Sequence, residues 1–196
     1  WVGHALENKE GLIALRYFFI VATLNGDDLG VYAIEEHFNK ELLENRKARE
    51  GIIFSLNFDK IKIFNEKKIS KVSNKRNQVR LLKSALQSVK NNEIEIGRIF
   101  DLEKFATQFA IIDLMAGYHG LGNNAIYYFN PITNLIEPIT REYNYLRYSE
   151  GLTNVEIMID KYQGEGDGWA FANKFFQNKD FTAQYLTQLL KLSDKK

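Results

Sequence analysis

A short polar loop is the part of this sequence best suited to carry chemistry. The stretch GYHGLGNNAIYYF (117–129) follows an apolar run and ends in an aromatic one, and between them it holds one histidine, three glycines and two asparagines. Imidazole exchanges protons near neutral pH, so His119 could act as a general base. Asn124 lies five residues further on, at a place where an asparagine could also form an Asx turn into a strand. The loop is therefore either a polar site or a turn between two core elements.

Two more polar groups follow strand-like runs. Glu142 offers a carboxylate, the kind of ligand that Mg²⁺ prefers, but it could equally pair with the adjacent Arg141 on the surface. Glu35, Glu36 and His37 come directly after a predicted hairpin. Two acids in a row also suit the first turn of a helix. A structural alternative therefore stays open for each of these residues.

A helix and a pair of strands must hold the polar loop in place. Asp101 is a good N-cap residue, and a helix that begins after it leads directly into the loop. After the loop, residues 125–129 and 135–139 are typical of two strands, joined by a turn at Asn130-Pro131. We expect the helix to be central because one of its faces is apolar. The residues of this face are Phe105, Phe109, Ile112 and Met115.

The first part of the chain predicts a hairpin. Residues 15–24 are rich in β-branched and aromatic side chains, and residues 29–34 form the return strand. Asn25-Gly26 tolerates the positive φ angles that a tight turn needs. We expect a helix over 35–46 and strand structure over 52–64.

The two ends of the chain predict further helices. A short helix over 4–10 should end at Gly11, with His4 exposed and remote from the other polar residues. The last helix should be capped by Asp180 and carry apolar residues at helical spacing. Because the chain opens on Trp1 without a methionine, we expect it to be a fragment of a longer protein.

Residues 59–90 are strongly basic. Their acidic residues are Asp59 and Glu66 alone. Apolar residues at helical spacing predict an amphipathic helix over 76–89. The basic side chains form either a solvated helix face or a docking surface for an acidic partner. They are Lys60, Lys62, Lys67, Lys68, Lys71, Lys75, Arg76, Arg80, Lys83 and Lys90.

Composition narrows the class of protein. With 196 residues, 45% of them apolar, the chain is long enough for one domain or two closely packed lobes. The absence of cysteine excludes disulfides and thiolate metal sites. No apolar run approaches the roughly 20 residues that a membrane span needs. A formal net charge of +1 makes nucleic-acid binding a weaker alternative, confined to the basic helix.

The order of these elements resembles a protein kinase, in which a loop of the form D-x-x-x-x-N follows a central helix and a hairpin then leads to a metal-binding acid. Two segments also resemble signatures of the CotH family of spore-coat-type atypical kinases. The first is TLNGDDLGVYAIEEHFNKELLE (23–44), and the second is HGLGNNAIYYFNPITNLIEPI (119–139). Together they cover about a quarter of the chain, in the family's order.

The resemblance implies an α+β, kinase-like fold over residues 1–196 as a single domain. It would contain mostly the C-terminal lobe, part of the N-terminal lobe and a lobe boundary near residue 38. It also implies binding of ATP with Mg²⁺ or Mn²⁺ and phosphorylation of protein Ser or Thr. Glu35, Glu36 and His37 would lie beside the adenine. Asn124 and Glu142 would bind the metal, and His119 would occupy the position of the catalytic base.

Three departures from the family pattern motivate a second hypothesis. His119 and Glu142 stand where the family has Asp, and the longer arm of glutamate displaces its carboxylate. The strands that grip the phosphates are expected before Trp1. The chain could therefore be a pseudokinase, a structural or surface-binding protein without catalysis. The sequence leaves the location open, and the family resemblance makes an extracytoplasmic, cell-surface or spore-coat location one possibility. It implies a protein substrate or a coat protein as the partner.

Overall fold

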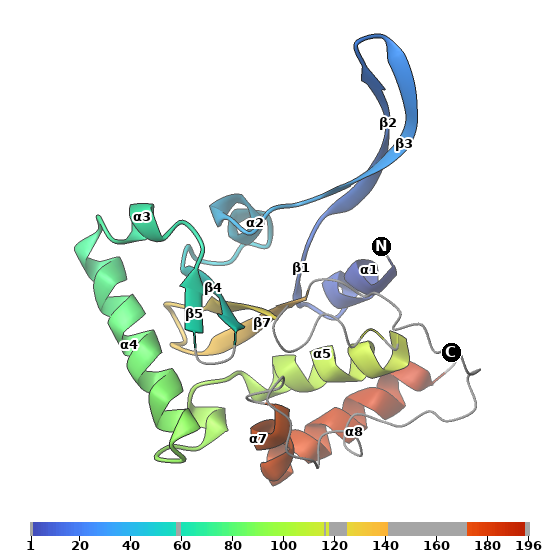
Figure 1. Cartoon of the computed structure of the whole chain (residues 1–196). Helices are drawn as coiled ribbons and strands as arrows, with labels where there is room; N and C mark the ends of the chain where they lie inside the picture. The colour runs from blue at the N-terminus through green and yellow to red at the C-terminus, as the bar shows by residue number, and fades with distance from the viewer. Residues whose placement is uncertain (1, 58–59, 116, 118–124, 141–171, 195–196) are drawn as a thin grey trace.

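A computed structural model describes residues 2–57, 60–115, 117, 125–140 and 172–194 of the chain. The described residues form a five-stranded sheet, a separate two-stranded hairpin and helices around the sheet (Figure 1). The predicted α+β class is therefore confirmed. The division into two lobes stays a prediction.

The five-stranded sheet has the order β1-β7-β6-β4-β5. The single parallel pairing among these strands is that of β1 with β7, and the other neighbours are antiparallel. The predicted strand region 52–64 is a pair of strands, β4 and β5, which form an antiparallel hairpin. The bounds are β1 Ile13–Ala14, β4 Ile52–Asn57, β5 Lys60–Ile63, β6 Ile126–Phe129 and β7 Ile136–Thr140.

Strands β2 (Tyr17–Leu24) and β3 (Asp27–Glu35) form the predicted hairpin, which projects away from the rest of the molecule (Figure 1). Its turn has φ angles of 54° at Asn25 and 94° at Gly26, as the Asn-Gly pair predicts. Neighbouring residues on a strand point to opposite faces. Because Phe18 and Phe19 are both exposed, the hairpin presents apolar side chains on both of its faces.

Both faces of the five-stranded sheet are covered by apolar side chains. On one face, Ile52 and Phe54 of β4 pack against α4 (Ser73–Lys90), α5 (Leu102–Met115), α7 (Ala172–Gln177) and α8 (Lys179–Ser193). On the other face, Ile53 joins a cluster with Phe38 and α2 (Lys40–Asn45). The alternation along β4 follows from the two-residue period of a strand. The remaining helices are α1 Val2–Lys9, α3 Glu66–Ile69 and the 3₁₀ turn η1 Ile96–Arg98.

The predicted central helix is α5, which lies alongside α8 (Figure 1). The N–H of Lys104 donates to Asp101 Oδ1 over 3.2 Å, so Asp101 caps the helix as predicted. Phe105, Phe109 and Ile112 are buried. The predicted basic helix is α4, which buries Leu82, Leu86 and Val89 and thus confirms the amphipathic pattern.

Two predicted helix starts are wrong. The helix predicted from residue 35 begins at Lys40, because β3 continues to Glu35 and the side chain of Asn39 caps the helix by accepting the N–H of Leu42. The last helix is capped by Asn178, whose Oδ1 accepts the N–H of Phe181 over 2.9 Å. Asp180 lies within the first turn of that helix, where an acid also favours the helix dipole. In both cases an asparagine caps the helix.

Candidate functional site

Three strand ends lie side by side at one edge of the five-stranded sheet. Ile126 at the start of β6 pairs with Ile139 near the end of β7. Ala14, the last residue of β1, pairs in parallel with Thr140, the last residue of β7. The chain therefore enters β6, leaves β7 and leaves β1 at the same edge of the sheet. We call this edge, where β1 ends at Ala14, β6 begins at Ile126 and β7 ends at Thr140, the site edge.

The residues predicted to do the catalytic chemistry are close in sequence to the strand ends at the site edge. His119 and Asn124 precede β6, and Glu142 follows β7 by two positions. All three lie outside the residues that the structure describes. Their roles therefore stay predictions.

The β2–β3 hairpin connects the site edge to the segment Glu35–His37. The chain leaves β1 at Ala14, and Arg16 lies just before the hairpin that returns at Glu35. The N–H of Glu36 donates to the C=O of Arg16 over 2.9 Å. After α2, Arg46 Nε donates to the C=O of Ala14 over 2.9 Å. The segment and the C-terminal end of α2 are thereby each tied to the chain that leaves β1.

The side chain of Glu36 is held by a clamp of two residues. Arg16 Nη2 and Nε donate to Glu36 Oε1 over 2.7 and 3.1 Å, and the N–H of Arg16 donates to Oε2 over 3.1 Å. Asn45 Nδ2 donates to Oε1 over 2.8 Å. Burial by itself would raise the pKa of the Glu36 carboxyl, but these hydrogen bonds outweigh it and hold the pKa below its ordinary value of 4.5. The carboxylate of Glu36 thus positions the segment.

The Glu36 clamp makes the stability of the protein depend on pH in the acid range. Glu36→Gln is expected to lower the free energy of unfolding near neutral pH, with a deficit that shrinks as the pH falls below about 4.5. A carboxyl whose pKa is lowered by folding stabilises the fold above its unfolded-state pKa and loses this effect as the pH falls through its folded-state pKa. Urea unfolding over a series of pH values measures the difference.

Glu44→Gln serves as the control for this prediction. Glu44 lies on the exposed face of α2, 3.5 Å from Lys40 Nζ. An exposed ion pair of this kind contributes little to stability, so the same chemical change should have little effect at any pH. A deficit of Glu36→Gln that stays constant from neutral to acid pH would contradict the clamp.

His37 lines a pocket. Its side chain is exposed, and its ring centroid lies 6.1 Å from that of Phe38 and 6.4 Å from that of Phe64. The pocket has a volume of about 430 Å³ and is also lined by Glu50 and Lys75, which form an ion pair. It lies beside the segment Glu35–His37 and offers both rings and charges to a ligand.

His4 and Glu7 are a polar pair that the sequence analysis did not identify. His4 was expected to be exposed and remote, and this is wrong, because the side chain is buried between Glu7 and Glu35. Its Nδ1 lies 3.5 Å from Glu7 Oε2, and its Nε2 lies 3.5 Å from Glu35 Oε1. The spacing of three residues between His4 and Glu7 on a helix was the signal that could have found the pair. The contact ties α1 to the end of β3, so Glu35 is also partly held in place.

The strand after the polar loop is anchored in the core. Tyr128 and Phe129 are buried, and the hydroxyl of Tyr128 donates to the C=O of Arg49 over 2.5 Å. Burial, with the nearby charge of Glu137, raises the pKa of Tyr128 far above its usual range. The phenol therefore remains a hydrogen-bond donor and holds β6 against the chain that enters β4.

Within the described ranges, no group of three or more His, Asp or Glu side chains could hold a metal ion. The predicted metal ligands Asn124 and Glu142 lie outside these ranges. No helix in the described part of the chain is long and apolar enough to cross a membrane.

Comparison with known families identifies the class of this protein. The family model described as "CotH kinase protein" matches residues 5–196, which is nearly the whole chain. The chain therefore belongs to the CotH kinase protein family, as the two signature segments indicated. A comparison with curated proteins found no match.

Proposed function

We propose that this protein is an atypical protein kinase that binds ATP with Mg²⁺ or Mn²⁺ and transfers phosphate to Ser or Thr of a protein substrate. The observation that carries the proposal is the site edge. The register of β1, β6 and β7 puts the start of β6 and the end of β7 beside the end of β1, from which the chain continues toward Glu35–His37. His119 and Asn124 precede β6 in sequence, and Glu142 follows β7. Membership of the CotH kinase protein family supports the same function.

Each predicted residue then has a role. The segment Glu35–His37 lies beside the adenine, and Glu36 contributes its backbone because Arg16 and Asn45 occupy its carboxylate. Asn124 and Glu142 offer oxygen ligands, the kind that Mg²⁺ takes in phosphate-transfer sites. His119 accepts the proton of the attacking hydroxyl. A metal held by Asn124 and Glu142 would supply positive charge to balance that developing on the phosphates.

The proposed lobe boundary lies near residue 38. The hairpin β2–β3 belongs to the N-terminal lobe in this assignment, and the five-stranded sheet with its helices belongs to the C-terminal lobe. An isolated two-stranded hairpin is marginally stable in water, and this one exposes apolar residues on both faces. A strand or a partner surface that packs on the hairpin would bury these apolar residues.

A second candidate function is that of a pseudokinase, which keeps the fold and binds partners without catalysis. His119 and Glu142 in place of Asp favour it. The longer Glu142 side chain shifts its carboxylate by about one C–C bond, and in-line transfer is sensitive to displacements of this size.

Calorimetric titration of ATP into the intact protein separates the two candidates. The kinase proposal predicts binding that requires Mg²⁺ or Mn²⁺ and is lost when EDTA removes the metal. GTP at the same concentration serves as the control for recognition of the base. No heat of binding with ATP under any metal condition would contradict the kinase proposal and favour the pseudokinase.

A further inference from the structure

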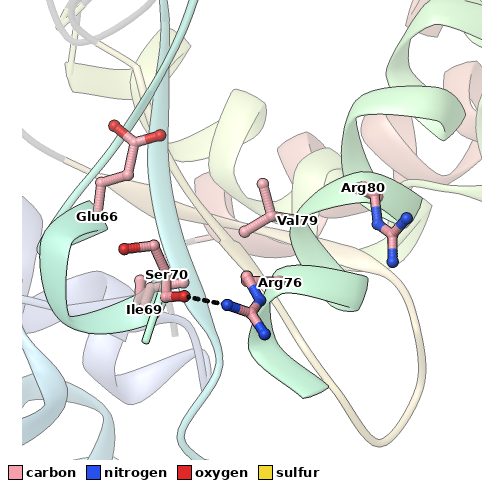
Figure 2. Close-up of a pocket in the computed structure, with 6 residues that line it drawn as sticks. All are labelled: Glu66, Ile69, Ser70, Arg76, Val79 and Arg80. Carbon is pink, nitrogen blue, oxygen red and sulfur yellow. Dashed lines mark hydrogen bonds between the residues drawn. The ribbon is translucent and has the colours of Figure 1, made fainter. Parts of the chain in front are cut away.

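A small pocket lies between helices α3 and α4, on the side of the most basic segment of the chain (Figure 2). Its volume is about 300 Å³. The buried side chain of Ile69 and the partly buried Val79 supply apolar surface. Arg76 and Arg80 flank Val79 on the same helix, so the pocket combines an apolar floor with two positive charges. The lining residues are Glu66, Ile69, Ser70, Arg76, Val79 and Arg80.

The two arginines are oriented by neutral groups. Arg76 Nη1 donates to the C=O of Ser70 over 3.1 Å, as the dashed line in Figure 2 shows. Arg80 Nη2 donates to Asn77 Oδ1 over 2.5 Å. No ion pair joins either guanidinium to a carboxylate among the described residues. Each guanidinium keeps further N–H donors in a planar fork that matches a carboxylate.

The charge around this pocket is one-sided. Residues 66–90 contain eight of the 26 Lys and Arg of the chain but one of its 25 Asp and Glu. The chain as a whole has a formal net charge of +1, so the basic charge is concentrated here and the rest carries an acidic excess. A concentrated field of one sign attracts a partner of the opposite sign and increases its rate of association.

We infer that this pocket docks an acidic segment of a protein partner in which Asp or Glu residues flank a large apolar side chain. The apolar side chain fills the space over Ile69 and Val79, and the carboxylates pair with Arg76 and Arg80. Nucleic acid fits less well, because α4 carries no aromatic residue on which a base could stack. The inference concerns binding alone, goes beyond the proposed function and does not require catalysis.

Fluorescence anisotropy with a labelled peptide tests the inference in the intact protein. The probe is a short fluorescein-labelled peptide of Asp and Glu around a central Phe, and its matched partner has Ser in place of Phe. The Phe peptide should bind more tightly than the Ser peptide. Arg76→Glu combined with Arg80→Glu should weaken binding of the Phe peptide by about tenfold or more. Val79→Asn should remove the preference for Phe, since it makes the floor of the pocket polar.

The control variant makes the same change of net charge at residues outside the pocket. Lys62→Glu combined with Lys179→Glu reverses two exposed lysines that do not line the pocket, and it should change the affinity by about twofold at most. Circular dichroism of each variant verifies that the helices are intact. Because no ATP is present, the result is independent of whether the protein proves to be a kinase.

Three results would overturn the inference. The first is attraction by net charge alone. It would appear as equal affinity for the Phe and Ser peptides, or as an equal loss of affinity in the Arg76→Glu/Arg80→Glu and Lys62→Glu/Lys179→Glu variants. The second is a single-stranded oligonucleotide that displaces the peptide and binds more tightly, with the same dependence on Arg76 and Arg80. The third is self-association, seen by sedimentation and abolished by the pocket reversal, in which Glu93-Ile94-Glu95 of a second copy would be the occupant.

Discussion

Asn124→Ala in the intact protein is expected to reduce metal-dependent phosphate transfer by about 100-fold or more. A metal ligand in such a site holds the ion that neutralises the developing charge, an effect of several kcal/mol. Glu142→Ala should cause a loss of similar size. Transfer of radiolabelled phosphate from ATP to a mixture of candidate proteins, at saturating Mg²⁺, measures both.

Asn123→Ala is the matched control, because the neighbouring residue has the same amide and differs only in position. It should leave the rate within about a factor of a few of wild type, as substitutions outside the reacting groups commonly do. Equal loss in the two asparagine variants would point to disruption of the loop. Wild-type rates in both Asn124→Ala and Glu142→Ala would show that the metal ligands are assigned wrongly.

Phe105→Ala is expected to lower the free energy of unfolding by about 4 kcal/mol. The Phe105 ring is almost completely buried on α5, and its centroid lies 4.6 Å from that of Phe175 and 5.4 Å from that of Phe100. The Phe105 ring also stacks on the ring of Tyr127 of β6, and the two ring centroids are 6.0 Å apart. Removing it leaves a cavity between the sheet and the α5–α8 layer. Urea denaturation followed by circular dichroism measures the loss.

Phe19→Ala is the control for this core substitution. This substitution removes the same number of atoms as Phe105→Ala. Because Phe19 is 60% exposed on the hairpin, it should lower the free energy of unfolding much less. Phe105→Leu should lie between wild type and Phe105→Ala because it refills part of the cavity. Similar destabilisation by Phe105→Ala and Phe19→Ala would contradict the position of Phe105 at the centre of the core.

Elements with a strong local signal were predictable from the sequence. Asn25-Gly26 predicts its turn because only a few residue types tolerate positive φ, and the structure has that geometry. Asp101 predicts the start of α5 for an equally local reason, the need of the first N–H groups for an acceptor. The start of α8 was predicted wrongly, at Asp180. Asn178 is the cap because the path of the chain before α8 brings its side chain to the N–H of Phe181.

Contacts between distant parts of the chain were beyond sequence reasoning. The burial of His4 depends on α1 packing beside the end of β3, where Glu35 meets it. Likewise, the acidic pair Glu35-Glu36 suits a helix locally, but Arg16 and Asn45 hold Glu36 in an extended segment. These partners lie 20 and nine residues away in sequence. A pattern of residue types carries no information about which of many possible partners will be adjacent.

The sequence by itself determined the family, the α+β class, the amphipathic α4, the apolar α5 and the order of the polar segments, because each depends on neighbouring residues or on their period along the chain. Only the tertiary structure decided that β1 pairs in parallel with β7, which brings the first part of the chain to the site edge. It also decided that α3 and α4 enclose a pocket at Arg76 and Arg80. The physical reason is that sheet register and helix packing are set by burial of apolar surface summed over the whole domain, and no short segment contains that sum.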